Sequence, residues 1–211
     1  MMVTLMVMGL LFSCKKSSTP IPKDYTVLIK DKTWWGQLTY TGQTAEYYCI
    51  QFNANGSLTW SQLLGDYPGQ WVINGKRLTM IISVNGLQIE ADISDYNKLL
   101  NITDNINSLN VNSGELTANP NVILDNTAWT GTYFNGSSQQ PLQINFKPNS
   151  KVDMKFGAFA VTTYTYTRSS LGAVIRHSVG ENYPFFAVLT SGNLMKGSEQ
   201  DSRFPLQAIK Q

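Results

Sequence analysis

The chain has 211 residues, a net charge of +2, 42% hydrophobic residues and only 14% charged residues, against about 25% charged residues in an average soluble domain. This balance excludes a protein that binds nucleic acid through a basic field, a charge-rich disordered chain and a coiled coil rich in Glu and Lys. It also excludes a polytopic membrane protein, because only one apolar run approaches the length that spans a bilayer.

The chain opens with an uncharged apolar stretch over residues 1–13, which is too short to cross a bilayer and favours a secretory signal peptide. The stretch ends in Leu11-Phe12-Ser13-Cys14, which resembles the lipobox of bacterial lipoproteins and implies cleavage before Cys14 and acylation of its thiol. The alternative is an ordinary signal peptide in which Cys14 is incidental. Because the basic segment that normally opens a signal peptide is missing, we expect the natural start to lie upstream.

Residues 14–23 are polar and contain two prolines, which is typical of a flexible tether. The lack of an acidic residue directly after Cys14 implies, by resemblance to bacterial lipoprotein sorting, an outer-membrane location, with either face of that membrane open. We expect the lipidated Cys14 to be the membrane anchor. Cys49 is then the one remaining thiol, so we expect neither a disulfide framework nor a cysteine-based metal site.

The rest of the chain contains a tandem repeat with a spacing of 94 residues. Turn-forming residues over 114–121 mark the join, so the sequence predicts one repeat over 24–118 and a second over 119–211. The alignment needs no gap between residues 29 and 60, and its matched pairs include Ile29 with Ile123, Asp31 with Asp125, Thr33 with Thr127, Trp35 with Trp129, Ile50 with Ile144 and Phe52 with Phe146.

Each repeat is expected to consist mainly of short β-strands. Apolar and polar residues alternate with a period of two around Ile50, Leu58 and Val152, and residues 53–56 and 74–75 carry hairpin signals. One helix candidate covers residues 101–109, but its Asn content argues against it. Further strands are predicted over residues 71–73, 78–84, 87–93, 99–102, 161–168, 173–177, 185–189 and 204–209.

Many short strands separated by turns predict an all-β fold of two tandem, small meander β-barrels, each with six to eight strands. The alternative is one larger barrel or sandwich that combines both repeats.

Three motifs in the first repeat, Trp35-Gly36, Phe52-x-x-x-Gly56 and Gly69-x-Trp71, together resemble the lipocalin-like domains of Bacteroidetes lipoproteins. In the second repeat the resemblance covers residues 121–156, and Tyr164 or Tyr166 stands near the place of the missing tryptophan. The resemblance implies a small β-barrel and an export route. It implies no particular activity or ligand.

Signatures of catalysis are weak in this sequence. His177 is the only histidine, lacks the partners of a metal site or a catalytic triad, and is expected at a surface or partly buried position. Glu90 and Asp92 share one strand face, and a polysaccharide hydrolase that uses these two carboxylates is one alternative function. A solvated strand face explains the same spacing. We predict no catalytic residue, no metal site and no cofactor.

The candidates for ligand binding are aromatic. By the repeat alignment Trp35, Trp60 and Trp129 face inward, where packing of a core competes with a binding role. Trp34 aligns with Ala128 and is expected to be an exposed contact for a sugar ring or a partner protein. The candidate set consists of Trp34, Trp35, Trp60, Trp71 and Trp129.

The two repeats carry opposite charge. Residues 24–118 contain five basic and nine acidic residues, for a net charge of −4, and residues 119–211 contain eight and five, for +3. Opposite charge favours docking of one repeat on the other, and we expect the second repeat to cover Cys49, which lies on the outward side of its strand. Lys147, Lys151 and Lys155 face either solvent, an acidic glycan or lipid head groups.

The sequence therefore predicts a non-enzymatic outer-membrane lipoprotein of the cell envelope with a binding role. The partners expected are a small apolar ligand, a glycan or an envelope protein, and not nucleic acid. A cavity of about 300 Å³ or more inside a barrel would favour a ligand carrier. Barrels filled with side chains would favour the alternative of a structural or interaction module.

Overall fold

The computed structural model describes residues 23–40, 45–84, 86–106, 109–116, 122–169, 174–177, 184–199 and 204–211. The predicted signal peptide, Cys14, nearly all of the predicted tether and most of the predicted join lie outside these residues. Apart from the single-turn helix α1 (Thr26–Ile29), the described elements are strands, so the all-β class is confirmed. Within the described part of the chain, no helix is both long enough and apolar enough to span a bilayer.

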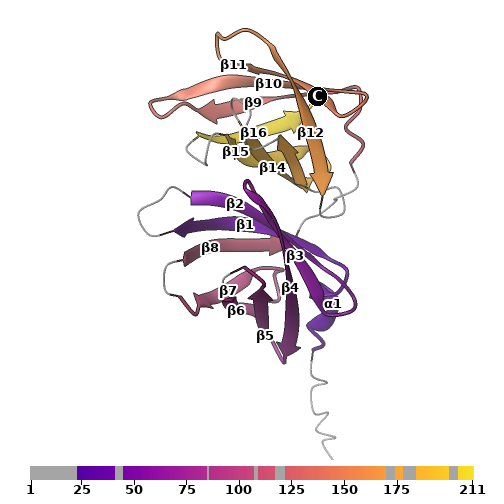
Figure 1. The fold of residues 1–211 in the computed structure, drawn as a ribbon, viewed down its shortest axis with the longest axis vertical. Helices are drawn as coiled ribbons and strands as arrows, with labels where there is room; N and C mark the ends of the chain where they lie inside the picture. Colours follow the sequence, from indigo (N-terminus) through magenta and orange to yellow (C-terminus); the bar gives the residue numbers. More distant parts are fainter. Residues whose placement is uncertain are drawn as a thin grey trace, which may run out of the picture.

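Residues 23–116, called the first unit below, form an eight-stranded antiparallel sheet that curls into a barrel-like shape (Figure 1). The strand order is β7-β6-β5-β4-β3-β2-β1-β8, so the hydrogen-bonded ladder is open between β7 and β8. At this seam a Cβ on Gly114 would lie 2.7 Å from Cδ1 of Leu99, so side-chain packing joins the two edges. The strands are β1 (Thr33–Tyr40), β2 (Ala45–Phe52), β3 (Ser57–Gln62), β4 (Gly65–Asn74), β5 (Arg77–Ile82), β6 (Leu87–Ile93), β7 (Leu99–Asp104) and β8 (Leu109–Leu116).

Residues 122–211, called the second unit, form a closed barrel in which β16 returns to pair with β9. The ladders of the described residues join strands of the same unit, so two barrel-like units are confirmed and the alternative of one larger barrel or sandwich is wrong. The strands are β9 (Thr127–Phe134), β10 (Gln139–Lys147), β11 (Lys151–Phe156), β12 (Thr162–Ser169), β13 (Val174–His177), β14 (Phe185–Ser191), β15 (Leu194–Glu199) and β16 (Phe204–Lys210).

The strands form where apolar residues alternate with polar ones, and the turns form where the sequence tolerates a positive φ. β6 has the predicted bounds 87–93. Gly56 (φ 83°) and Gly75 (φ 59°) stand in the predicted hairpin turns, a conformation that glycine adopts without steric cost. Residues 101–104 belong to β7 and residue 109 begins β8, which agrees with the argument against a helix over 101–109.

The first strands of the two units differ by one residue from the expected alignment. Trp34 lies opposite Ile50 in the ladder of β1 and β2, and Trp129 lies opposite Ile144 in the ladder of β9 and β10. The isoleucines are 94 residues apart, but these tryptophans are 95 apart. Because neighbouring side chains on a strand point to opposite faces, Trp34 has the inward position that the alignment assigns to Trp35.

The segments that precede these strands show the same shift. Asp31 (φ 55°) and Asn126 (φ 61°) have the same unusual backbone conformation and are 95 residues apart. Ile29 and Leu124 are both buried in the cores of their units, whereas Ile123 is 77% exposed. The structural repeat is therefore 95 residues in this segment and 94 residues from β2 to β3, and the hairpin between β9 and β10 absorbs the difference.

Gly131 lies where β9 meets β16 and the second barrel closes. A Cβ at this position would lie 1.8 Å from the carbonyl oxygen of Gln207 and 2.7 Å from Cα of Ala208, so the backbone itself must move. We expect Gly131→Ala to lower the free energy of unfolding in urea by about 1–3 kcal/mol, the usual range for overpacking.

The matched control is Gly65→Ala, because a Cβ on Gly65 would meet only the side chain of Tyr67, at 3.7 Å. This variant should change the free energy of unfolding by less than about 0.5 kcal/mol. Equal losses in the two variants would contradict a steric role of Gly131 in closing the barrel.

Candidate functional site

The interior of the first unit is packed with apolar side chains. Trp34 is fully buried, and its Nε1 donates a hydrogen bond to the carbonyl oxygen of Leu28 (3.0 Å), so α1 and Trp34 hold each other in place. Trp60 stacks on Tyr48 with ring centroids 4.5 Å apart. Trp71 is half-buried and packs against the same core. Three of the five candidate tryptophans therefore serve the core of this unit.

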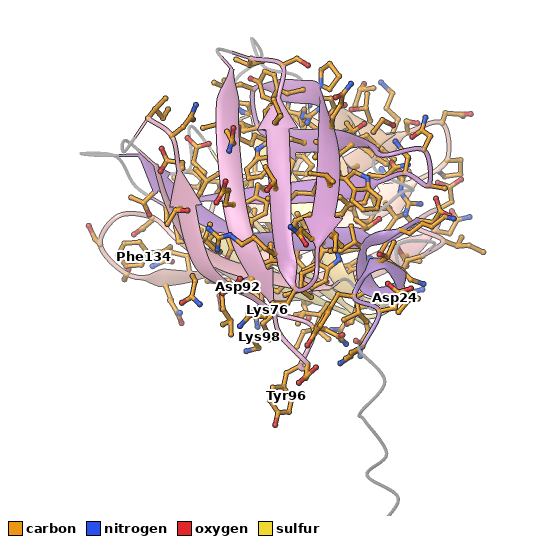
Figure 2. All side chains as sticks on the ribbon, turned by 90° about the horizontal axis from the view of Figure 1, so that it is seen from below. Asp24, Lys76, Asp92, Tyr96, Lys98 and Phe134 are labelled. Atoms are coloured by element: carbon orange, nitrogen blue, oxygen red, sulfur yellow. The ribbon has the colours of Figure 1, made fainter. Side chains whose placement is uncertain are left out.

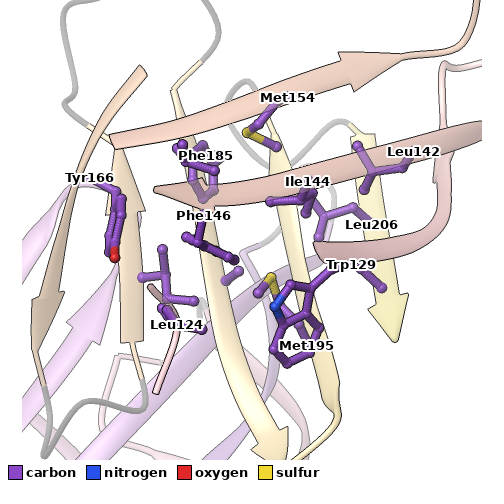
Figure 3. Packing of buried hydrophobic residues seen from close by; sticks show 14 of the residues in the cluster. Leu124, Trp129, Leu142, Ile144, Phe146, Met154, Tyr166, Phe185, Met195 and Leu206 are labelled. Carbon is purple, nitrogen blue, oxygen red and sulfur yellow. The ribbon is translucent and has the colours of Figure 1, made fainter. Parts of the chain in front are cut away.

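The interior of the second unit is filled in the same way (Figure 3). Trp129 is fully buried, and its Nε1 donates to Oγ1 of Thr127 (2.9 Å). Phe146 contacts Trp129 edge-on on one side, at 6.4 Å, and Tyr166 on the other, at 5.1 Å between ring centroids. Buried aromatic rings thus form part of the core in the interior of both units.

Trp34 and Trp35 exchange the roles expected from the sequence. The expectation that Trp34 is exposed is wrong, because it is fully buried inside the first unit. The expectation that Trp35 faces inward is also wrong, because it packs between the two units. The physical reason is the one-residue shift of β1, which turns each of its side chains to the opposite face.

An apolar cluster joins the two units. From the first unit Cys49 and Leu63 are buried in it, and from the second unit Phe186 and Val188. The Nζ of Lys196 lies 5.1 Å from the centre of the Trp35 ring, a cation–π geometry that joins β15 to β1. This inter-unit cluster consists of Trp35, Tyr47, Cys49, Leu63, Val174, Phe186 and Val188. The expected cover over Cys49 is confirmed.

Arg176 of β13 reaches across to the hairpin between β3 and β4 of the first unit. Its Nε and one terminal nitrogen donate to the carbonyl oxygen of Gln62 at 2.9 and 2.6 Å. The same terminal nitrogen lies 3.1 Å from the carbonyl oxygen of Gly65 and 2.8 Å from Oδ1 of Asp66. The side chain of Arg176 is 14% exposed, so its charge is compensated mainly by these acceptors.

The carboxylate of Asp66 responds to this contact. Burial opposes its ionisation, but hydrogen bonds from Arg176 and Ser61 outweigh burial and lower the pKa of Asp66. Asp66 therefore stays charged beside Arg176 at neutral pH. The contact combines a fork-shaped donor with backbone acceptors, a geometry that lysine does not reproduce.

Glu90 and Asp92 lie on the outside of β6, where Asp92 and Lys76 lie close together (Figure 2). A hydrogen bond from Arg77 (2.9 Å) lowers the pKa of Glu90. A hydrogen bond from Asn101 (2.8 Å), with two basic side chains nearby, lowers the pKa of Asp92. A glycosidase needs one carboxyl group whose pKa is raised so that it can donate a proton, and neither carboxyl group has this property.

His177 is fully buried inside the second barrel, deeper than the sequence suggests. Its Nδ1 lies 2.7 Å from the carbonyl oxygen of Thr165, and its ring lies between Tyr164 and Phe185, at 4.5 and 5.9 Å. The strand alternation turns Arg176 outward to the first unit and His177 inward to the core. Among the residues that the structure describes, no group of three or more His, Cys, Asp or Glu side chains is placed to hold a metal ion.

The sequence predicts that one repeat docks on the other, but it does not identify the apolar residues of the inter-unit cluster that make this contact. Residues 185–189 form an uninterrupted apolar run, and all five are buried. A run without alternation indicates a strand that is covered on both faces. That signal, together with Cys49, identifies one strand from each unit in the contact.

Comparisons of this chain with protein-family models, with curated proteins and with solved structures give no match. The resemblance to lipocalin-like domains therefore depends on the motif residues alone.

Proposed function

We propose that this chain is a non-enzymatic lipoprotein of the cell envelope, anchored in the outer membrane through Cys14, whose folded body binds a partner through its outer surface. In this proposal the two barrel-like units are lipocalin-like domains. They act as a rigid interaction module and not as carriers of an enclosed ligand.

The observation that carries this choice is the packing of both interiors. Trp34 and Trp129 are fully buried at equivalent places in the apolar cores of their units, and Phe146 contacts Trp129 edge-on. A carrier of small molecules needs an enclosed cavity of about 300 Å³ or more, in which the ligand contacts the lining side chains. Here the neighbours of these rings are other side chains of the same barrel.

The surroundings of Glu90 and Asp92 support a role without hydrolysis. Both carboxylates are engaged by Arg77, at 2.9 Å and 3.6 Å, on the outer face of a sheet. Their lowered pKa values keep both groups ionised at neutral pH. This state suits a salt-bridge network better than proton donation to a leaving group.

The anchoring part of the proposal predicts the outcome of a single substitution. We expect Cys14→Ser to abolish incorporation of a radiolabelled fatty acid and to move the protein from the membrane fraction to the soluble fraction, because one polar side chain then replaces the only acylation site. Cys49→Ser is the matched control and should keep both label and membrane association. Membrane association of Cys14→Ser equal to that of the parent would contradict the anchor.

The interaction-module part is tested by native mass spectrometry of the protein purified from its own cells. Filled barrels predict that the folded protein has the mass of the acylated chain alone. A retained small molecule that survives purification and dissociates on unfolding would overturn the proposal in favour of a carrier.

A further inference from the structure

Three lysines share the outer face of the hairpin formed by β10 and β11. Lys147 lies directly opposite Lys151 in the ladder, and Lys155 lies opposite Gln143. Like charges in directly opposed positions destabilise a sheet. Asp153 lies between them and binds Lys147 (2.5 Å), so the hairpin face keeps a net positive charge.

This face, called the lysine face below, is turned away from the first unit. In the closed strand order, β10 and β11 stand across the barrel from β14, whose outer side chains enter the inter-unit cluster, and from β15, whose Lys196 lies over the Trp35 ring. Figure 1 shows β10 and β11 at the end of the molecule remote from α1, where the described chain begins. The lysine face is therefore presented away from the anchored end.

The surroundings of the lysine face are rich in hydroxyl groups. Thr163 donates to Asp153 (2.6 Å), and Lys151 donates to Thr165 (2.7 Å), both on the exposed side of β12. The loop from β11 to β12 carries two exposed apolar side chains, Phe159 (72%) and Val161 (57%). Lysines fix anionic groups, threonines exchange hydrogen bonds with sugar hydroxyls, and an exposed aromatic ring stacks on a sugar ring.

We propose that the lysine face binds an acidic polysaccharide, with Lys147, Lys151 and Lys155 contacting its carboxylates and Phe159 stacking at one end. This inference rests on the proposed function and names the partner class of the outer surface. A polysaccharide is favoured over lipid head groups because the lysine face points away from the end at which the chain enters its anchored tether.

The test measures binding of the full-length chain, kept in neutral detergent, to polygalacturonate at low and moderate salt. We expect binding that weakens as salt rises, because exposed charges are screened. The triple variant Lys147→Gln, Lys151→Gln and Lys155→Gln should bind about tenfold more weakly, as expected for the loss of three charge contacts at the surface. Fully methyl-esterified polygalacturonate has the same backbone without the charges and should bind weakly to the parent and to the variant alike.

The matched control is Lys30→Gln, Lys32→Gln and Lys98→Gln, which removes the same charge from exposed sites on the first unit. It should retain binding within about twofold of the parent. Equal losses in both triple variants, or no binding of polygalacturonate by the parent, would overturn the proposal. Binding to phosphatidylglycerol vesicles through the same lysines, without binding to polygalacturonate, would also overturn it in favour of a membrane surface. If the chain is acylated at Cys14 but does not bind polygalacturonate, the proposed function stands and only the acidic polysaccharide is rejected as its partner.

Discussion

Trp34→Ala is expected to lower the free energy of unfolding of the first unit by about 3–5 kcal/mol, the range for truncation of a large buried aromatic side chain. Trp34 is fully buried, and its indole nitrogen binds the carbonyl oxygen of Leu28. The truncation opens a cavity in the core and removes the donor that holds α1. Urea unfolding measures the loss, and hydrogen exchange should rise in the strands of the first unit.

The adjacent Trp35→Ala is the matched variant, because it removes the same side chain from the same strand. Trp35 lies in the inter-unit cluster, so we expect a smaller loss, about 2 kcal/mol. Hydrogen exchange should then rise on both sides of the contact, in β2 and in β14. A larger loss for Trp35→Ala than for Trp34→Ala would contradict the register of β1.

Arg176→Met should uncouple the two units. The substitution keeps much of the side-chain volume but removes the hydrogen bonds that Arg176 donates to the carbonyl oxygens of Gln62 and Gly65 and to the carboxylate of Asp66. Removing one partner of a mostly buried, charged contact costs about 3 kcal/mol. We expect thermal unfolding, followed by calorimetry, to change from one transition to two.

Arg77→Met tests whether loss of any arginine has this effect. Arg77 also contacts two carboxylates, but it does so on the solvent-exposed face of β5 and β6, where ion pairs contribute little to stability. This variant should keep a single transition. A split transition in Arg77→Met, or a single transition in Arg176→Met, would argue against Arg176 as the coupling residue.

The sequence predicts the strands well because their signal is local. Alternation of apolar and polar residues over a few positions reports which side chains are buried, and β6 appears with the expected bounds. The number of units follows from the repeat, and the all-β class follows from the residue types. The sequence does not predict strands at β1, β8, β9 and β15, and of these β15 lacks a regular alternation of apolar and polar residues.

The register of β1 cannot be predicted from such a local signal. Trp35 matches Trp129 by identity at a spacing of 94, and identity outweighs any other local signal in an ungapped alignment. The pairing of Trp34 with Ile50 sets the register of β1. Pairing between two strands cannot be deduced from the sequence of either strand alone. An error of one residue is small for an alignment but exchanges the two faces of a strand, and the assignment of candidate binding residues depends on that face.

The contact between the units is heterologous, since it joins different walls of two related barrels, and contacts of this type can in principle add further copies without end. The strand pairing shows which residues oppose the addition of a further copy. The pair Val174 and Val188 in the contact corresponds to Arg77 and Asp92 on the free wall of the first unit.

The free wall of the second unit, which corresponds to the contact wall of the first unit, is polar as well. The pair Trp35 and Cys49 in the contact corresponds to Thr130 and Gln143 on the second unit. A third copy that docked on either wall would have to bury charges or amides where the existing contact buries apolar side chains, which is unfavourable. Divergence of the two repeats at these positions thus disfavours the addition of a third unit through the same walls.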